Sequence, residues 1–307
     1  MANALLTPQM IARQALATLY ETLLMQSLVY TDLSTEFTTQ KIGNVVNVRK
    51  PAVFVANKFN RATGIQLQDA TEDKIPIALD QIADVSFAVT SEELTLSIID
   101  FDSQLLSPAM MAIAQRIDRD LLALRNDITQ KAGLSGQVGN EWSKPEVLIE
   151  AGRQLELMNV PDDDRAAVVG PTTKAKWLNS DVLKLAQNSG STEALRRGSI
   201  GNDLFGFSAY STQNVGQPSA TPAAGQPQTE VGLAFHRTAF AFVSAPLEIA
   251  PGSFAAVEAY RGLSIRVAYA YDINKKQTTV SIDTLYGVKT LDKNRAVLLK
   301  GDDKPGA

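Results

Sequence analysis

The chain has 307 residues, enough to bury a sizeable core as one large domain or as two smaller ones. With 45% hydrophobic and 20% charged residues it has the composition of a globular protein, which argues against disorder. A formal charge of −4 offers no basic surface for nucleic acid or anionic membrane, and the lack of cysteine excludes disulfides, thiolate nucleophiles and cysteine-based zinc sites.

Residues 1–40 begin with an amphipathic helix. Thr7 suits the N-cap and Pro8 the first helical position, and apolar residues then recur at helical spacing as far as Leu24. After Tyr30 the sequence becomes polar and rich in threonine, which indicates an extended arm. No basic start precedes an apolar run, and no stretch approaches about 18 uninterrupted apolar residues, so we expect neither a signal peptide nor a membrane span.

Residues 41–98 change to strand character. Alternating apolar residues on both sides of a turn at residues 61–64 predict a long two-stranded hairpin. Its basic residues come first and its acidic residues follow. One interpretation is that these charges pair across the hairpin. The other is that some of them bind a neighbouring copy, because an isolated hairpin is only marginally stable and needs a surface to lie on. The candidate contacts between copies are Arg49, Lys50, Lys58, Arg61, Asp69, Glu72 and Asp73.

A long helix over residues 106–126 is the predicted centre of the chain. Ser107 suits its N-cap and Pro108 its first helical position. At about 1.5 Å per residue the helix is about 28 Å long. One stripe is apolar, while Asp118 falls with Arg116 and other polar residues on the remaining faces. The stripe consists of Met110, Ile113, Ile117, Leu121 and Leu124.

A separate lobe of alternating strands and helices follows a glycine-rich joint at residues 131–139. Ser143, Pro145 and Glu146 form a capping-box pattern, which predicts a helix that ends near Leu157. Turn residues and apolar periodicity then divide the rest of the chain. The further predicted elements are a buried strand at 165–170, a helix at 171–185, an exposed, uncharged, proline-rich loop at 216–229, strand segments at 233–245 and 263–282, and a frayed tail at 301–307.

No motif in the sequence predicts catalysis. The phosphate-binding loop and the nucleophile elbow of serine hydrolases are both absent. His236 lies in an apolar strand pattern and is interpreted as structural, and Asp162 to Asp164 lack the glycine and distant glutamate of a calcium loop. Trp142 and Trp177 are interpreted as packing residues. We therefore expect a protein that is not an enzyme, with no catalytic, cofactor-binding or metal-ligating residues.

The succession of these segments resembles the major capsid proteins of tailed bacteriophages, whose Hong Kong phage-type fold is also used by encapsulin shells. The resemblance covers most of the chain from residue 91 onward. It is carried by SEELTLSIIDFDSQLLSPAMMAIAQRIDRDLLALRN at 91–126, RAAVVGPTTKAKWLNSDVL at 165–183, GSIGNDLFGFSAYSTQNV at 198–215, AFHRTAFAFVSAPLE at 234–248 and SIRVAYAYDINKKQTTVSIDTLYGVKTLD at 264–292.

The resemblance implies an α+β phage capsid fold whose parts follow one another along the chain. In that mapping the proline-rich loop at 216–229 lies near the axis of the capsomer. The implied parts are an N-terminal arm at 1–40, an extended β-hairpin loop at 41–98, a peripheral domain with a long spine helix at 99–132, an axial domain at 133–255, and return strands of the peripheral domain with the C-terminal tail at 256–307.

The resemblance also implies a function. The chain would be a major capsid protein whose copies form the pentamers and hexamers of an icosahedral shell, through heterologous contacts that close on themselves. The shell would enclose the double-stranded DNA of a tailed phage without sequence-specific binding, in a virion assembled in the host cytoplasm. A separate scaffolding protein, a portal and a decoration protein are the further partners considered, with no membrane and no cofactor. The alternatives are an encapsulin-type shell around cargo enzymes, and a soluble α+β enzyme or ligand-binding protein.

Overall fold

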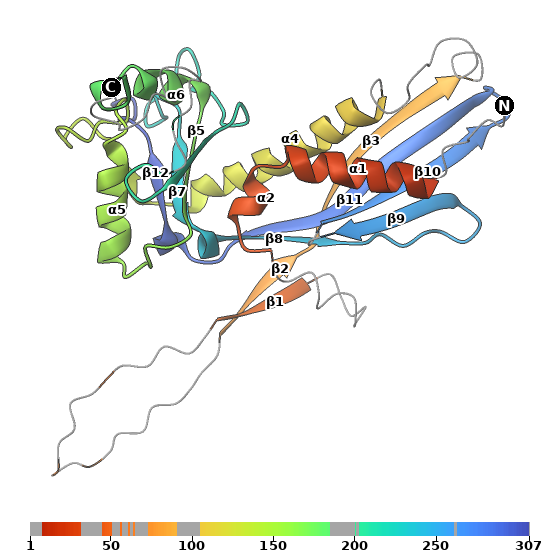
Figure 1. Cartoon of the computed structure of the whole chain (residues 1–307), viewed down its shortest axis with the longest axis horizontal. Helices are drawn as coiled ribbons and strands as arrows, with labels where there is room; N and C mark the ends of the chain where they lie inside the picture. Colours follow the sequence, from red (N-terminus) through yellow and green to blue (C-terminus); the bar gives the residue numbers. More distant parts are fainter. Residues whose placement is uncertain are drawn as a thin grey trace.

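Two five-stranded sheets lie in the two lobes of an elongated molecule (Figure 1). The structure, a computed structural model, describes residues 8–31, 45–50, 56, 61, 64, 73–90, 105–184, 200, 203–260 and 263–306. Helices and strands are both well represented in these residues, which confirms the predicted α+β class. Within the same residues, no helix combines the length and the apolar character needed to cross a membrane.

The longer sheet is antiparallel throughout. Its strand order is β3-β11-β10-β9, and β8 pairs with the part of β11 that extends beyond β3. β11 therefore holds the sheet together, because three other strands pair with it. β10 and β11 form the predicted hairpin, joined by a turn in which Lys276 has a φ of 50°. The strands are β3 (Gln81–Thr90), β8 (Phe240–Ala245), β9 (Phe254–Tyr260), β10 (Leu263–Asp272) and β11 (Gln277–Thr290).

Two helices, α1 (Pro8–Thr22) and α4 (Ser107–Ala123), lie side by side over one face of this sheet (Figure 1). Their apolar stripes share one core with the sheet, and Ile117 of α4 and Leu19 of α1 are fully buried in it. Burying one stripe of each helix against an apolar sheet face removes both surfaces from water. The predicted apolar stripe of the long helix is therefore confirmed at Ile117.

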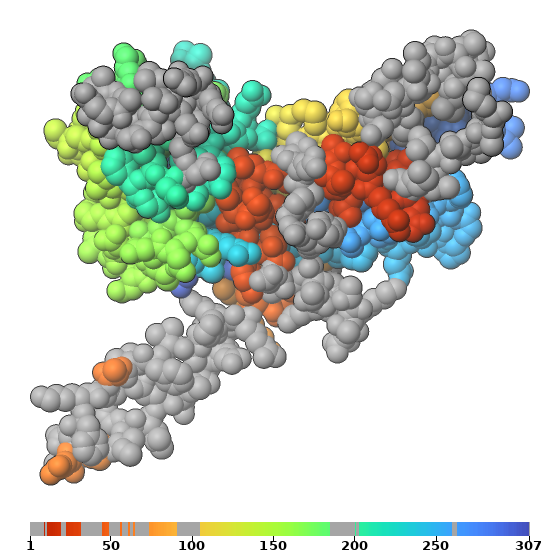
Figure 2. All heavy atoms as spheres, viewed as in Figure 1, coloured from red at the N-terminus to blue at the C-terminus, as the bar shows by residue number. Residues whose placement is uncertain are grey.

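Residues 8–31 do not form the arm that was expected for residues 1–40. α1 and α2 (Met25–Leu28) bury their apolar side chains in the core of their own chain, where α1 covers the outer side of the lobe (Figure 2). The Tyr30 amide donates to the Phe240 carbonyl oxygen of β8 at 3.1 Å. A free sheet face in the same chain satisfies the amphipathic stripe, so no neighbour is needed for it. Residues 1–7 and 32–44 lie outside the described residues.

The start of α4 differs from the predicted cap. Leu106 already has helical backbone angles, with φ −70° and ψ −48°, so Ser107 is the first residue of the helix and makes no capping hydrogen bond. Pro108 remains in the first turn, where a backbone N–H has no partner within the helix, so the lack of one costs no hydrogen bond. At the other end the helix tightens into a 3-10 turn, η2 (Leu124–Asp127).

The smaller sheet has the strand order β4-β12-β7-β5-β6, with parallel pairs at β4-β12 and β5-β6. Helices on this lobe enclose a second core, in which Trp177 is fully buried and donates its indole N–H to the Trp142 carbonyl oxygen at 3.0 Å. The strands are β4 (Lys131–Ala132), β5 (Arg165–Val169), β6 (Ser208–Ser211), β7 (Gly232–His236) and β12 (Ala296–Leu299), and the helices are α5 (Val147–Leu157), α6 (Pro171–Leu178) and α7 (Asp181–Lys184).

Two helix predictions in this lobe need correction. α5 ends at Leu157 as predicted, but it begins at Val147, after a series of turns, and no side-chain capping bond from Ser143 precedes it. The helix predicted at 171–185 is interrupted after Leu178. Asn179 and Ser180 end α6 in a turn, and α7 restarts at Asp181. Serine and asparagine favour such turns because their side chains compete for backbone hydrogen bonds.

The chain crosses between the lobes more often than the predicted boundaries allow. The segment predicted at 233–245 divides into β7, in the smaller sheet, and β8, in the longer one, with a 3-10 turn at Arg237–Ala239 between them. β3 belongs to the longer sheet and not to the extended loop, and β12 returns to the smaller sheet. The predicted extended loop at 41–98 therefore includes a strand of the longer sheet, and the boundary expected at residue 255 does not separate the two sheets.

The last described residues are not frayed. Lys300 is 4% exposed, and the amide of Lys304 donates to the Gln226 carbonyl oxygen at 2.9 Å while Gly225 donates to the Lys304 carbonyl oxygen at 2.8 Å. This exchange attaches the terminal segment to the proline-rich loop at 216–229. It satisfies backbone groups on both sides, which holds the loop in place.

Candidate functional site

A two-stranded ribbon projects from the body of the molecule (Figure 1). It consists of β1 (Val45–Lys50) and β2 (Asp73–Ala78), which pair only with each other. Val46 and Ile77 at its base are buried against Ala241 and Val243 of β8. An apolar base thus anchors the ribbon, while its other end points away from the longer sheet.

The structure brings together only some of the predicted contact residues. The register of the ribbon places Lys50 opposite Asp73 and Arg49 opposite Lys74. In this backbone register the first pair has opposite charges and the second pair has like charges. Arg61 is exposed. Lys58, Asp69 and Glu72 lie outside the described residues, so the choice between pairing within the hairpin and contact with another copy stays a prediction.

A glycine permits the close approach of the ribbon to the sheet. A Cβ atom on Gly287 of β11 would lie 2.1 Å from the carbonyl oxygen of Ala78, far inside van der Waals contact. Because this oxygen belongs to the backbone, it cannot rotate away as a side chain would. Gly287 therefore fixes how closely the end of β2 passes over the body.

A buried carboxylate joins three segments where the lobes meet. Asp118 of α4 is 2% exposed; its Oδ1 accepts from the Met25 amide at the start of α2 at 3.1 Å, and its Oδ2 accepts from Asn214 Nδ2 at 3.3 Å. Burial raises the pKa of Asp118, and these hydrogen bonds offset only part of that effect. Sequence analysis placed Asp118 on a polar face, so this connection was missed.

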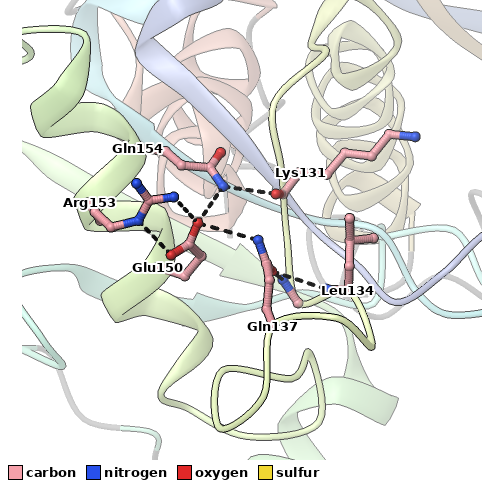
Figure 3. A network of polar contacts seen from close by, with 7 residues as sticks. Lys131, Leu134, Gln137, Glu150, Arg153 and Gln154 are labelled. Atoms are coloured by element: carbon pink, nitrogen blue, oxygen red, sulfur yellow. Dashed lines mark hydrogen bonds and ion pairs between the residues drawn. The ribbon is translucent and has the colours of Figure 1, made fainter.

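A second carboxylate fixes the outermost helix of the smaller lobe (Figure 3). Glu150 of α5 accepts two hydrogen bonds from Arg153, at 2.6 and 2.8 Å, and one each from Gln154 at 2.9 Å and Gln137 at 3.3 Å. The hydrogen-bonded Arg153 guanidinium is the main cause that lowers the pKa of Glu150. Gln154 also donates to the Lys131 carbonyl oxygen at 2.9 Å, so the network joins α5 to β4.

The same network presents apolar side chains to solvent. Val138, next to Gln137, is 88% exposed, and Leu157 on α5 is 67% exposed, with Ile149 and Met158 also exposed. Exposed apolar groups held by a rigid scaffold are typical of contact surfaces. We call Val138, Ile149, Leu157 and Met158 the α5 surface.

A comparable group lies at the opposite end of the molecule, around the β10-β11 turn (Figure 1). Ile273 in that turn is 76% exposed and Phe254 at the start of β9 is 66% exposed, with Tyr271 also exposed. Phe254 packs its ring against that of Tyr269, with the ring centroids 6.2 Å apart. Burial raises the pKa of Tyr269 to about 12. The elongated body therefore has exposed apolar groups at both ends.

The described residues contain no arrangement that matches a metal centre. No group of three or more His, Asp or Glu side chains converges there. His236 is buried, its Nδ1 lies 2.8 Å from Thr238 Oγ1, and burial is the main cause that lowers its pKa. These contacts fit the structural role expected for His236, since the ring caps the 3-10 turn through the Thr238 amide.

Comparison with solved structures identifies the fold. A structure from Mycobacterium phage Che8 is similar with a TM-score of 0.66 and 20% identity, over 90% of this chain and 90% of that chain. The capsid structure of the cyanophage P-SCSP1u is similar with a TM-score of 0.60 and 16% identity, over 87% of this chain and 86% of that chain. A virus-like particle from Pyrococcus furiosus is similar with a TM-score of 0.50 and 12% identity, over 94% of this chain and 97% of that chain.

No protein-family model and no curated protein sequence matches the chain. The structural likeness nevertheless extends over nearly the whole length of the chain and of the structures it matches. The two-lobed α+β architecture is therefore the fold of tailed-phage capsid structures, which confirms the resemblance at the level of the fold.

Proposed function

We propose that the chain is the major capsid protein of a tailed bacteriophage, whose copies assemble into a closed icosahedral shell of pentamers and hexamers around double-stranded DNA. In this proposal α4 is the spine helix and the lobe of the longer sheet is the peripheral domain. The lobe of the smaller sheet is the axial domain, and the β1-β2 ribbon is the base of the extended loop.

The observation that carries the proposal is the ribbon that leaves the body of a capsid-type fold. A two-stranded ribbon has too little apolar area of its own to be stable in water. In the described part of this one, Val46, Val48 and Ile77 are buried against β8, whereas Asn47 and Pro76 are exposed. Contact with a second copy would cover more of it. The exposed apolar groups at both ends of the body add two further places for such contacts.

Assembly is tested by the mass of the particles that the purified chain forms and by electron microscopy of those particles. We expect closed shells of megadalton mass. A stable monomer or dimer under all assembly conditions would contradict the proposal and would favour a discrete soluble protein.

The contribution of the α5 surface is tested by Ile149→Glu combined with Leu157→Glu. Both side chains are exposed, so the variant should fold, but two charges at an apolar contact oppose its burial and should greatly reduce particle yield. Met111→Glu is the matched control, since Met111 is exposed on α4 and belongs to neither apolar end. Equal yields from the two variants would rule out the α5 surface as a contact.

An encapsulin-type shell around protein cargo is the second candidate, because the similar structures include a virus-like particle as well as phage capsids. The contents of purified particles separate the two candidates. DNA inside particles from infected cells supports the phage capsid, whereas a copurifying enzyme without DNA supports the encapsulin-type shell.

The further partners belong to the phage proposal. A separate scaffolding protein, a portal and a decoration protein would complete a virion assembled in the host cytoplasm. The DNA would be enclosed without sequence-specific contacts, in line with the net charge of −4, because a mildly acidic wall does not hold a polyanion. Particle formation by the chain alone, compared with formation in lysates that contain the phage proteins, tests the need for a scaffold.

A further inference from the structure

A cavity lies where the end of α4, the proline-rich loop at 216–229 and the end of β12 meet. Its volume is about 620 Å³, within the range of about 300 to 1,000 Å³ that is usual for small-molecule sites. Its walls are fixed, because the loop shares backbone hydrogen bonds with Lys304 and the Gly301 amide donates to Thr229 Oγ1 at 2.8 Å. The cavity is thus bounded by segments that are far apart in the sequence.

Both charged residues among the described residues that line the cavity are basic. They are Arg125, from the end of the spine, and Lys300, from the end of β12, and no Asp or Glu lines it within the described part of the chain. The Lys300 ammonium is buried and already pairs with Asp303, which also accepts from Lys131 at 3.0 Å. Lys300 therefore already has a carboxylate partner, which leaves Arg125 as the lining cation without one.

Arg125 has no carboxylate partner among the described residues. Its Nη1 donates to the Val231 carbonyl oxygen at 3.3 Å, which uses one of the five N–H groups of a guanidinium. Burial lowers the pKa of Arg125, and no neighbouring acid counteracts that effect. A half-buried cation without a counter-charge is unfavourable, so the site as it stands favours the entry of an anion.

Glu230, a buried carboxylate close to the lining residues in the sequence, does not serve as the counter-charge of Arg125. Glu230 is 1% exposed, and its oxygens accept from the Thr172 amide at 3.0 Å, from the Thr173 amide at 2.7 Å and from Gln217 Nε2. Burial acts to raise the pKa of Glu230, but these hydrogen bonds outweigh it and hold that pKa below its ordinary value. The carboxylate is therefore already satisfied at the N-terminus of α6.

The remaining wall is neutral and polar. Gln226 and Ser219 line the cavity from the loop, and the loop backbone at Gly216 approaches the guanidinium so closely that a Cβ there would lie 3.6 Å from Arg125 Nη2. Amide and hydroxyl groups can donate hydrogen bonds to an oxyanion without opposing its charge.

We propose that this cavity binds a small oxyanion, a phosphate or a carboxylate, with the Arg125 guanidinium as its main ligand. A planar guanidinium binds either group through two parallel N–H···O hydrogen bonds, which gives both strength and orientation. The bound anion would join the end of α4 to the proline-rich loop and so connect the two lobes. The proposal does not depend on shell assembly, since every residue involved belongs to one chain.

The test is isothermal titration of the purified full chain with sodium phosphate, and separately with sodium acetate, at constant ionic strength. We expect saturable binding of phosphate, acetate or both; the comparison of the two arms identifies which oxyanion chemistry the site prefers. Arg125→Gln removes the charge and should weaken that binding about tenfold or more. Arg119→Gln is the matched control: it makes the same change at an exposed position of α4, outside the cavity, and should leave binding unaltered.

Gln226→Glu provides a second variant that does not rely on the fold tolerating the loss of Arg125. Gln226 is exposed at the cavity, so the change should preserve the fold and weaken binding of either anion by charge repulsion. Absence of saturable binding of both anions by the wild-type chain would overturn the proposal. Equal binding by the wild-type chain, Arg125→Gln and Gln226→Glu would overturn it as well. Particle formation, scored on the same samples, tests the proposed function separately.

Discussion

Asp118 illustrates how a single side chain can join parts of a fold that the sequence keeps apart. Its carboxylate receives hydrogen bonds from the start of α2 and from Asn214, which lies between β6 and β7. In the sequence a charged residue that shares a helix face with other polar residues is typical of a solvated position. Its partners come from segments about 95 residues away on either side, and no local pattern identifies them.

The raised pKa of Asp118 predicts a pH dependence. A raised pKa means that the folded chain binds this proton more tightly than the unfolded chain. The contribution to the free energy of unfolding is therefore fully present below an unfolded pKa of about 3.9, and it is lost as the pH rises through the folded pKa.

Asp118→Asn lacks this titration, so the stability of the wild type relative to the variant should fall as the pH rises above about 4. Urea titrations of both chains across this range measure the difference. A difference between wild type and Asp118→Asn that is the same at every pH would contradict the assignment.

A second prediction concerns Gly287. Gly287→Ala places a methyl group 2.1 Å from the Ala78 carbonyl oxygen, so β2 or β11 must move. We expect the free energy of unfolding to fall by at least about 2 kcal/mol, the middle of the range for overpacked cores. Gly136→Ala is the control, because a Cβ at Gly136 meets no atom within 4 Å. Equal stability of the two variants in thermal unfolding would show that the close approach is not required.

At the scale of the element, α4 depends on its apolar stripe. Ile117 is fully buried between α1 and the longer sheet, so Ile117→Asp would place an unpaired charge in the core at a cost of several kcal/mol, roughly the whole stability of a domain. We expect this variant to lose cooperative unfolding and to be insoluble. Gln115→Asp, on an exposed position of the same helix, should fold normally. A soluble Ile117→Asp chain with cooperative thermal unfolding would contradict this placement.

The sequence identified elements better than it identified their ends. α1 and α4 were predicted because each has one apolar stripe, and α5 because a capping-box pattern precedes it. β5 and the β10-β11 hairpin were predicted because their apolar residues are continuous or alternate. The start of α4 was missed because a Ser-Pro pair fits the first turn of a helix as well as its cap. The break after Leu178 was missed as well. Backbone angles at one or two residues decide such ends, and periodicity does not report them.

At the scale of the whole molecule, strand order was beyond the reach of the sequence. The segment that contains β8 was predicted as a strand and β12 was not, and no local pattern says which sheet either strand joins. The terminal segment was expected to be frayed because it is short and polar, yet Lys300 and Asp303 pair beside the proline-rich loop. The cavity at Arg125 was missed for the same reason, since three distant segments form its walls.

The ribbon charges give a prediction at this scale. Replacing Lys50 and Lys58 together by Glu should leave the body folded, because the buried base of the ribbon lies elsewhere, at Val46 and Ile77. If the basic strand contacts acidic residues of another copy, the reversal should reduce particle yield sharply, more so at low salt. Circular dichroism checks the fold and electron microscopy the yield. Unchanged yield would favour pairing within one hairpin.

Strand order also has a consequence for biosynthesis. β12, made only after residue 295, lies between β4 and β7, and β11 lies between β3 and β10. A nascent polypeptide on the ribosome therefore lacks an interior strand of the longer sheet until translation has passed residue 290, and an interior strand of the smaller sheet until it has passed residue 299. Neither sheet can therefore complete its strand pairing until the last sixth or so of the chain has been made.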